Sequence, residues 1–286
     1  MRARGRSAVL AVLLSVAPGV AQPSKFERGP GGVTHGPGMT GAGPAGVVVG
    51  KTAFNVAAYA VLAFETDQLT GADGSEILAW PNTGSMGASG NATGTTGTAP
   101  KLYANVVNGK PVARFTANRQ IVSTADPVLT GGVGVFVVAS HSAASSYPML
   151  FSISIGSPAV IELRCSGTTL RPEFFCGNSV VAAAAIPTAT WNLLEGFHNG
   201  TAPSGYLNGT QWGAGGNVAL PPSGPITVGN RGGAFAYQFV GDLAAVLVVN
   251  KPISTADRQS VEGYLAWKYG IQASLPAGHP YKASPP

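Results

Sequence analysis

Short apolar segments separated by glycine- and proline-rich turns constrain the fold of this chain more than any other feature. Its 286 residues include 40 glycines and 22 prolines, which lie in small clusters without the period of collagen. The apolar or alternating segments between them are 57–64, 111–115, 134–140, 149–155, 160–165, 180–186, 191–197, 205–207, 226–228 and 239–250. Segments of this length and spacing predict β-strands. We therefore expect an all-β fold, a sandwich of two antiparallel sheets around one core.

Two Asn-Gly pairs predict tight hairpins. Asn208-Gly209 lies between Tyr206-Leu207 and the run that begins at Thr210, and Asn108-Gly109 precedes the run 111–115. An Asn-Gly pair between strand-like runs is typical of a two-residue type I′ turn. Asp73-Gly74 predicts a third turn.

One helix is expected, from Ser254 to Tyr269. Ser254 can cap its first turn together with Asp257, and Gly270 can end it. Val261 and Leu265 follow at helical spacing, so we expect them to pack on the sandwich together with one of Tyr264 and Trp267. A helix whose apolar face is buried in this way has a structural role.

The N-terminal part of the chain differs from the rest. Residues 1–21 combine a basic start with an apolar stretch and small residues, which is typical of a secretory signal peptide; the alternative is an apolar arm that docks on another subunit. Residues 22–51 are rich in glycine and proline and are expected to form an extended linker or arm. Residues 52–286 form the predicted sandwich domain. The N-terminal apolar stretch is too short for a membrane span, and no other segment reaches roughly 18 consecutive apolar residues, so an integral membrane protein is not expected.

The charge pattern argues against a nucleic-acid partner. The net charge is +5, but three of the seventeen basic residues are Arg2, Arg4 and Arg6, which leaves fourteen basic against twelve acidic residues beyond them. The remaining basic residues are scattered singly, and none form a run that could follow a phosphate backbone.

Cys165 and Cys176 are the two cysteines, with ten residues between them. The segment between them has turn character, so the two thiols are candidates for a hairpin disulfide, which an exported chain would permit. The alternative is two separate buried thiols. No histidine stands at a ligand spacing from them, so a zinc site is not expected.

The C-terminal segment 239–281 resembles a known family. A Gly-Asp opens a long apolar strand, a capped helix ends in EGYLAWKYG, and Leu275-Pro276 and His279-Pro280-Tyr281 follow. This combination is similar to the closing segment of LamG-like jelly-roll domains, and the resemblance extends over about 57–281. It implies a concanavalin A-like sandwich. Such domains occur in bacterial surface proteins and phage virions, where they are thought to bind glycans or proteins.

The resemblance has one local departure. Phe64-Glu65-Thr66 stands where the family would have an aromatic residue followed by a loop aspartate, so no sugar or calcium site is carried over there. Asp67, Asp73 and Glu76 also lack the spacing of a twelve-residue calcium loop. No cofactor is expected, with calcium as the open alternative.

Catalysis is not expected from the residue pattern. A glycosidase of this fold would present acids at alternating positions of one strand, and the only such neighbours are Glu65 and Asp67, which we interpret as a solvated strand end. No serine lies in a G-x-S-x-G elbow for a histidine to activate. We therefore predict that the chain is not an enzyme.

Carbohydrate recognition requires an aromatic plane with polar groups at its rim. Trp191 and Trp267 lie in apolar runs and are expected in the core, which is also the more typical place for Trp80. The ligand-binding candidates that remain open are Trp212, Asn230, Arg231, Tyr237, Trp80 and Asn82.

Together these features predict an attachment or display module that binds a glycan or a surface protein. It would be extracellular or lie on a virion surface, with the N-terminal arm contacting virion or cell-envelope subunits. The alternatives are a purely structural component of a capsid, tail or cell wall, and a glycoside hydrolase.

Overall fold

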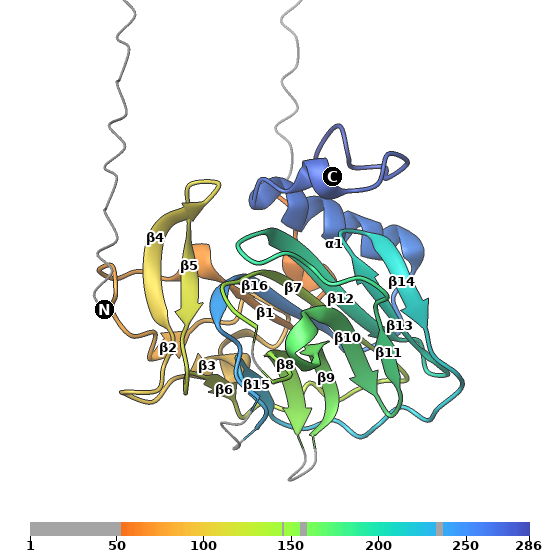
Figure 1. The fold of residues 1–286 in the computed structure, drawn as a ribbon, viewed down its shortest axis with the longest axis horizontal. Coiled ribbons are helices and arrows are strands. Elements are labelled where there is room, and N and C mark those ends of the chain that lie inside the picture. Colours follow the sequence, from red (N-terminus) through yellow and green to blue (C-terminus); the bar gives the residue numbers. More distant parts are fainter. Residues whose placement is uncertain (1–52, 145, 155–158, 233–236) are drawn as a thin grey trace, which may run out of the picture. The chain divides into compact units, whose positions relative to one another are not determined.

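The computed structural model describes residues 53–144, 146–154, 159–232 and 237–286. These residues form two antiparallel sheets of eight strands each together with one α-helix (Figure 1), so the prediction of an all-β jelly-roll sandwich is confirmed. The predictions for residues 1–21 and 22–51 concern segments that lie outside this part of the chain.

The helix-side sheet is the sheet against which the helix packs. β16 (Gly241–Val249) pairs with β5 (Lys110–Phe115) through its first residues and with β1 (Leu62–Glu65) through its second half, so two shorter strands continue the sheet beyond it. In order across the sheet the strands are β14 (Thr210–Ala214), β13 (Pro203–Leu207), β12 (Trp191–His198), β7 (Val133–His141), β16 (Gly241–Val249), β5 (Lys110–Phe115) and β4 (Lys101–Val107), with β1 (Leu62–Glu65) also beside β16.

The outer sheet forms the other layer of the sandwich. Its strands in order are β11 (Ser179–Val181), β10 (Arg171–Cys176), β9 (Ala159–Ser166), β8 (Met149–Ser154), β15 (Ile226–Val228), β6 (Ile121–Ser123), β3 (Ala92–Thr93) and β2 (Ala79–Trp80). Short 3₁₀ turns lie at Val56–Ala58, Thr66–Gln68, Gly87–Gly90, Gly167–Thr169 and Gln272–Ser274.

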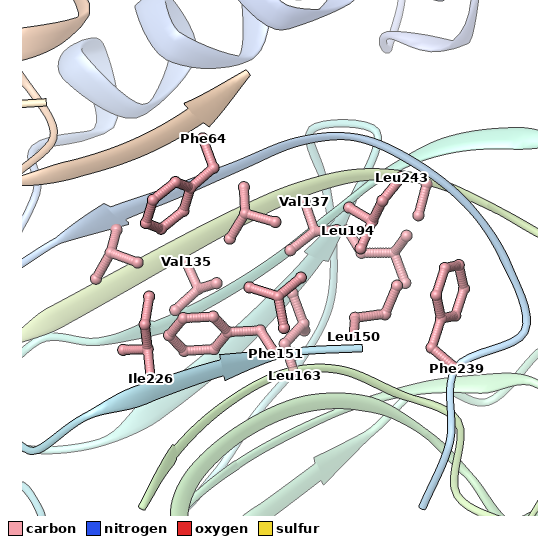
Figure 2. Close-up of a cluster of buried hydrophobic side chains, with 14 of the residues drawn as sticks. Phe64, Val135, Val137, Leu150, Phe151, Leu163, Leu194, Ile226, Phe239 and Leu243 are labelled. Atoms are coloured by element: carbon pink, nitrogen blue, oxygen red, sulfur yellow. The ribbon is translucent and has the colours of Figure 1, made fainter. Parts of the chain in front are cut away.

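Two apolar layers hold these elements together. Along β7, Val135 and Val137 point into the core between the sheets (Figure 2), while Phe136 and Val138 point to the layer beneath the helix. Both faces of this strand are therefore buried, which explains why its sequence is a continuous apolar run rather than an alternating one.

Helix α1 (Thr255–Lys268) begins and ends where the sequence predicts. The Ser254 hydroxyl accepts a hydrogen bond from the Asp257 amide at 3.1 Å, and Gly270 has a positive φ of 71° just after the last turn. Val261 and Leu265 are fully buried against the helix-side sheet. Tyr264 packs there as well, so the predicted packing face is confirmed.

Both Asn-Gly hairpins are confirmed. Asn208 and Gly209 have φ values of 52° and 77° between β13 and β14, and Asn108 and Gly109 have 46° and 69° between β4 and β5, as a type I′ turn requires. The Asn108 side chain also donates to the Lys268 carbonyl at 3.0 Å. The β4–β5 hairpin thereby satisfies a carbonyl at the end of α1.

A buried polar cluster fixes the C-terminal segment. Glu262 of α1 accepts a hydrogen bond from Arg258, and its Oε2 lies 2.8 Å from Nε2 of His279. Beside it lies Glu195 of β12, whose Oε1 accepts from the Gly209 amide at 3.1 Å. Burial, followed by the negative charge of Glu262, holds the pKa of Glu195 well above its ordinary value. His279 thus ties the segment after the helix back to α1.

This cluster gives a pH prediction. A group whose pKa is raised by folding contributes stability at low pH and loses it as the pH rises through the folded value. We expect Glu195→Gln, which keeps the acceptor for Gly209, to flatten the fall of unfolding free energy above pH 5, by up to about 1.4 kcal/mol per pH unit. Denaturant titrations from pH 5 to 9 measure this.

Glu76→Gln is the control, because folding lowers the pKa of Glu76 whereas it raises that of Glu195. The Gly97 amide lowers the pKa of Glu76, with Arg119 adding to the effect, so between pH 5 and 9 this variant should stay parallel to the wild type and change the profile only at more acid pH. Parallel profiles of wild type and Glu195→Gln over the whole range from pH 5 to 9 would contradict the assignment.

The predicted disulfide is wrong. The strand register places Cys165 opposite Pro172 and Cys176 opposite Ile161, so the two cysteines are four residues apart along neighbouring strands, about 13 Å. Both are free and fully buried. The hairpin turns at 167–170, close to Cys165, and the rest of the intervening segment is strand β10 rather than turn.

A thiol measurement follows from this. We expect reducing agent to leave the melting temperature unchanged, and we expect two titratable thiols after denaturation without reductant. The native protein should react slowly, since burial raises the pKa of both thiols to about 12. A drop in melting temperature on reduction would show that a disulfide exists.

Candidate functional site

Two of the predicted ligand residues, Trp80 and Asn82, are buried by contacts within the fold. Trp80 is fully buried in the core between the sheets, and its Nε1 donates to the Glu65 carbonyl at 3.2 Å. The Asn82 side chain is buried too, and its Oδ1 accepts from the Ala63 amide at 2.7 Å. Both side chains are occupied by the fold, so these two candidates are wrong.

Trp212 is also not the exposed platform expected of it. It is half-buried and packs against the core between the sheets from edge strand β14. Its ring lies directly over Gly205, where any Cβ would overlap it. A side chain held in this way stabilises the sheet edge and offers little ring surface to a ligand.

The remaining candidates lie together on the outer sheet. Asn230, Arg231 and Tyr237 follow β15 and lie over the face of the outer sheet that points away from the core. Asn230 is fully buried, and its carbonyl accepts from the Ser152 hydroxyl at 3.1 Å. Arg231 and Tyr237 are half-buried above it, with the guanidinium carbon 5.0 Å from the ring centre.

Two further aromatic rings and a second arginine complete this surface. Tyr147 meets Tyr237 edge-on at 6.0 Å between ring centres. The Arg164 guanidinium lies 5.0 Å from the Tyr147 ring and 5.6 Å from the Phe175 ring. We call this group the aromatic–arginine patch; its members are Tyr147, Arg164, Phe175, Arg231 and Tyr237.

Two buried glutamates form the floor of the patch. Glu173 of β10 accepts from Arg164 at 2.9 and 3.1 Å and from the Ser179 hydroxyl at 2.8 Å. Glu162 of β9 accepts from Arg164 and lies 2.6 Å from Nε of Arg231. Arg164 is therefore held by both glutamates, and Arg231 is paired with Glu162.

The environments of the two glutamates differ. Burial is the main cause that raises the pKa of Glu162, and Arg164 and Arg231 only partly oppose it. Burial would also raise the pKa of Glu173, but the hydrogen bonds from Arg164 and Ser179 outweigh it and lower that pKa. Both charges remain paired with guanidinium groups directly above them.

Asn230 carries a buried hydrogen-bond donor that has no acceptor within the described part of the chain. Nδ2 of Asn230 has no hydrogen-bond partner among the described residues, although its Oδ1 accepts from the Arg231 amide at 2.8 Å. Buried polar atoms without partners are rare in folded proteins. The side-chain amide of Asn230 is thus a buried donor without an acceptor among the described residues.

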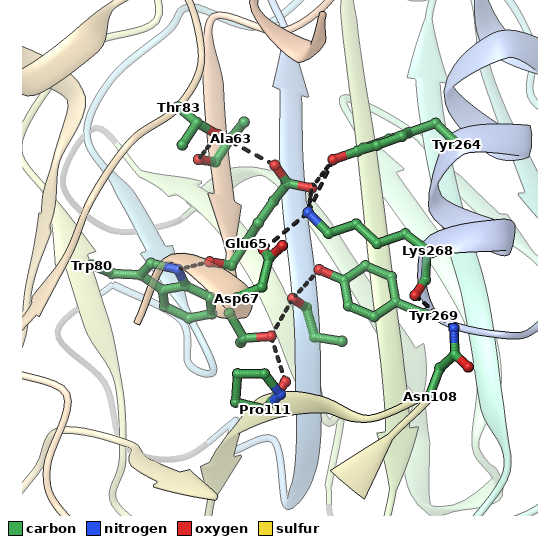
Figure 3. Close-up of polar contacts among 12 residues, drawn as sticks. Ala63, Glu65, Asp67, Trp80, Thr83, Asn108, Pro111, Tyr264, Lys268 and Tyr269 are labelled. Carbon is green, nitrogen blue, oxygen red and sulfur yellow. Dashed lines mark hydrogen bonds and ion pairs between the residues drawn. The ribbon is translucent and has the colours of Figure 1, made fainter. Parts of the chain in front are cut away.

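The acids weighed for catalysis have structural partners. Oε1 of Glu65 accepts from the Lys268 ammonium and the Tyr264 hydroxyl, both at 2.8 Å, and Asp67 lies 2.9 Å from the same ammonium (Figure 3). Glu65 is 3% exposed, so the interpretation as a solvated strand end is wrong. The pair ties β1 to α1.

Two hollows lie elsewhere on the described residues. The polar side chains Glu65, Tyr264 and Lys268 line a space of about 260 Å³ and already bond one another. A second hollow of about 310 Å³ beside β2 is lined by Leu69, Ile77 and Leu78 among others, without an aromatic ring. Across the described ranges, no three His, Cys, Asp or Glu side chains are placed to hold a metal ion, and no helix there is long and apolar enough to cross a membrane.

Sequence reasoning missed Tyr147, Glu162, Arg164, Glu173 and Phe175. A signal was present in β9, where Ile161, Leu163 and Cys165 alternate with Glu162 and Arg164. A strand with charged residues on every second position has one polar face. Pairing that face with β10 required the register, which the sequence does not specify.

No protein-family model and no curated protein sequence matches this chain. Solved structures do resemble it. Domain 4 of AbnA, an extracellular GH43 arabinanase from Geobacillus stearothermophilus, in complex with arabinotriose, shares 14% identity over 70% of this chain and 96% of that domain, with a TM-score of 0.52. At this identity the likeness shows the fold alone, a β-sandwich.

Two weaker likenesses cover only part of the other protein. Trypanosoma rangeli sialidase shares 12% identity over 74% of this chain and 33% of its own, with a TM-score of 0.48. The botulinum neurotoxin serotype D binding domain shares 12% over 73% and 52%, with a TM-score of 0.49.

The expectation that the chain is not an enzyme is corrected, because a domain of a GH43 arabinanase is among the solved structures that share this fold. Neither a reaction nor catalytic residues are carried over at this identity.

Proposed function

We propose that this protein binds carbohydrate through the aromatic–arginine patch. The observation that carries the proposal is the gathering of three aromatic rings and two guanidinium groups on one face of the outer sheet. Aromatic faces pack on the C–H faces of sugars, and guanidinium N–H groups donate to hydroxyls at the rim. The lectin-like fold and the arabinotriose complex of domain 4 of AbnA support the proposal.

Pre-organisation is the physical advantage of this surface. Glu162 and Glu173 hold both arginines in place from below, and the side chains of Arg164 and Arg231 are only 13% and 24% exposed. A ligand would therefore lose little free energy in ordering these long side chains. Binding would add contacts to a surface that is already arranged.

Oligosaccharide binding to the full chain tests the proposal. We expect Tyr237→Ala to weaken binding about thirtyfold, the effect of removing an aromatic anchor worth about 2 kcal/mol. Screening on a glycan array selects the ligand, and titration calorimetry measures the loss.

Tyr103→Ala is the matched control. Tyr103 also lies beneath an arginine, with the Arg114 guanidinium 4.2 Å from its ring, but it is on β4 of the helix-side sheet. Its removal should leave affinity unchanged. Equal losses in both variants, or none in Tyr237→Ala, would argue against the patch.

The cellular setting is part of the proposal. We place the protein outside the cytoplasm or on a virion surface, attached to a glycan or a glycan-bearing surface. The competing role is a structural component of a capsid, tail or cell wall without a ligand. That role predicts no binding on the array.

A further inference from the structure

The charges of the aromatic–arginine patch cancel within the site. Arg164 donates hydrogen bonds from Nε and Nη2 to Glu173 and from Nη1 to Glu162. Nε of Arg231 faces the other oxygen of Glu162 at 2.6 Å. Two positive and two negative charges therefore meet within hydrogen-bond distance.

Burial makes this pairing hard to undo. The side chains of Glu162 and Glu173 are 0% and 4% exposed. A ligand carboxylate that drew a guanidinium away would leave a buried glutamate without its cation, which is strongly unfavourable. A carboxylate that did not do so would lie above two buried negative charges without a free counter-charge.

Neutral hydroxyls have no such conflict. They can accept from guanidinium N–H groups that remain paired with the glutamates, and the Tyr147 and Tyr237 rings can cover apolar sugar faces. Each of these contacts is available without separating an ion pair.

One further cation shares this face. Arg171 also points outward from β10, two residues before Glu173, and its Nε donates to the Ala182 carbonyl at 2.7 Å. That bond holds it toward the residues that follow edge strand β11. It therefore needs a variant of its own in any test of charge selectivity.

We infer that the patch selects neutral saccharides and discriminates against those that carry a carboxylate. The inference rests on the proposed function and narrows it to a class of ligand. It differs from what a pair of arginines alone would indicate, since exposed arginines are typical of sites for acidic ligands. Here both are neutralised from within the fold.

The test compares matched neutral and acidic trisaccharides on the full chain. Calorimetry is run with arabinotriose, xylotriose and galactotriose, and with trigalacturonic acid and 3′-sialyllactose. We expect at least one neutral ligand to bind at least tenfold more tightly than either acidic one. Because no net charge is involved, its affinity should change less than twofold between 50 and 500 mM salt.

Variants then locate the selectivity. Glu173→Gln removes one negative charge and should raise affinity for trigalacturonic acid at least threefold, while Arg171→Gln should leave the ratio of neutral to acidic binding unchanged. The salt dependence of the wild type gives an independent reading if Glu173→Gln does not fold.

The outcomes separate the two proposals. Acidic ligands that bind as tightly as neutral ones, and lose affinity in Tyr237→Ala, would overturn the neutral selectivity and leave carbohydrate binding in place. Failure of all five ligands to bind would overturn both.

Discussion

Replacing Leu265 with alanine is expected to destabilise the protein by about 2 to 5 kcal/mol. Leu265 is fully buried at the centre of the layer between α1 and the helix-side sheet, where Phe136, Leu193 and Leu247 also lie. Truncation removes apolar surface and leaves a cavity, because strands on the far side hold the sheet in place. Chemical denaturation with a two-state fit measures the loss.

Gln259→Ala is the control on the same helix. Its side chain lies partly exposed, and alanine is the better helix former, so we expect a change of less than about 0.5 kcal/mol. Unchanged stability in Leu265→Ala would show that α1 is not part of the core. Loss of glycan binding without loss of stability would place the ligand on the helix instead.

The second large effect is expected for Lys268→Met. The Lys268 ammonium bonds Glu65, Asp67 and Tyr264 (Figure 3), and Glu65 is buried. Removal of the cation leaves an unpaired buried carboxylate, which costs about 3 kcal/mol or more. The loss of unfolding free energy is smaller than for a fully enclosed ion pair, because the neighbouring hollow admits solvent and Asp67 is 22% exposed.

A double-mutant cycle isolates this ion pair. Glu65→Gln removes the buried charge, so in the Glu65→Gln background Lys268→Met should cost much less than in the wild type. The coupling energy from denaturation curves of the four proteins measures the difference. Additive losses would mean that the two side chains act independently.

Much of the fold could be predicted from the sequence because its signals are local. The continuous apolar runs of β7 and β16 mark strands buried on both faces. Asn208-Gly209 specifies its turn through the backbone conformation that these residues tolerate. Ser254 and Gly270 delimit the helix in the same local way.

The errors arose where the outcome depends on register or on distant partners. Leu170 adopts a positive φ of 53° in the β9–β10 turn, which no propensity indicates, and that turn sets which residues face Cys165 and Cys176. Trp80 and Trp212 look alike as isolated aromatic residues. Only packing against the opposite sheet distinguishes them from a ligand platform.

Only part of the candidate site could be predicted from the sequence, because the rest depends on strand pairing. Asn230, Arg231 and Tyr237 are close in sequence, and their polar and aromatic character indicated a binding loop. Tyr147, Arg164 and Phe175 come from β-strands and loops elsewhere in the chain. Sheet pairing brings them together, so the glutamate floor beneath the arginines was not foreseeable.

A crystal structure of the protein with its best neutral oligosaccharide tests the central claim most directly. The account predicts sugar rings stacked on Tyr147 and Tyr237, hydroxyls within hydrogen-bond distance of Arg231, and both arginines still paired with Glu162 and Glu173. A saccharide bound at the hollow beside β2, at α1 or at Trp212, with the patch empty, would contradict it.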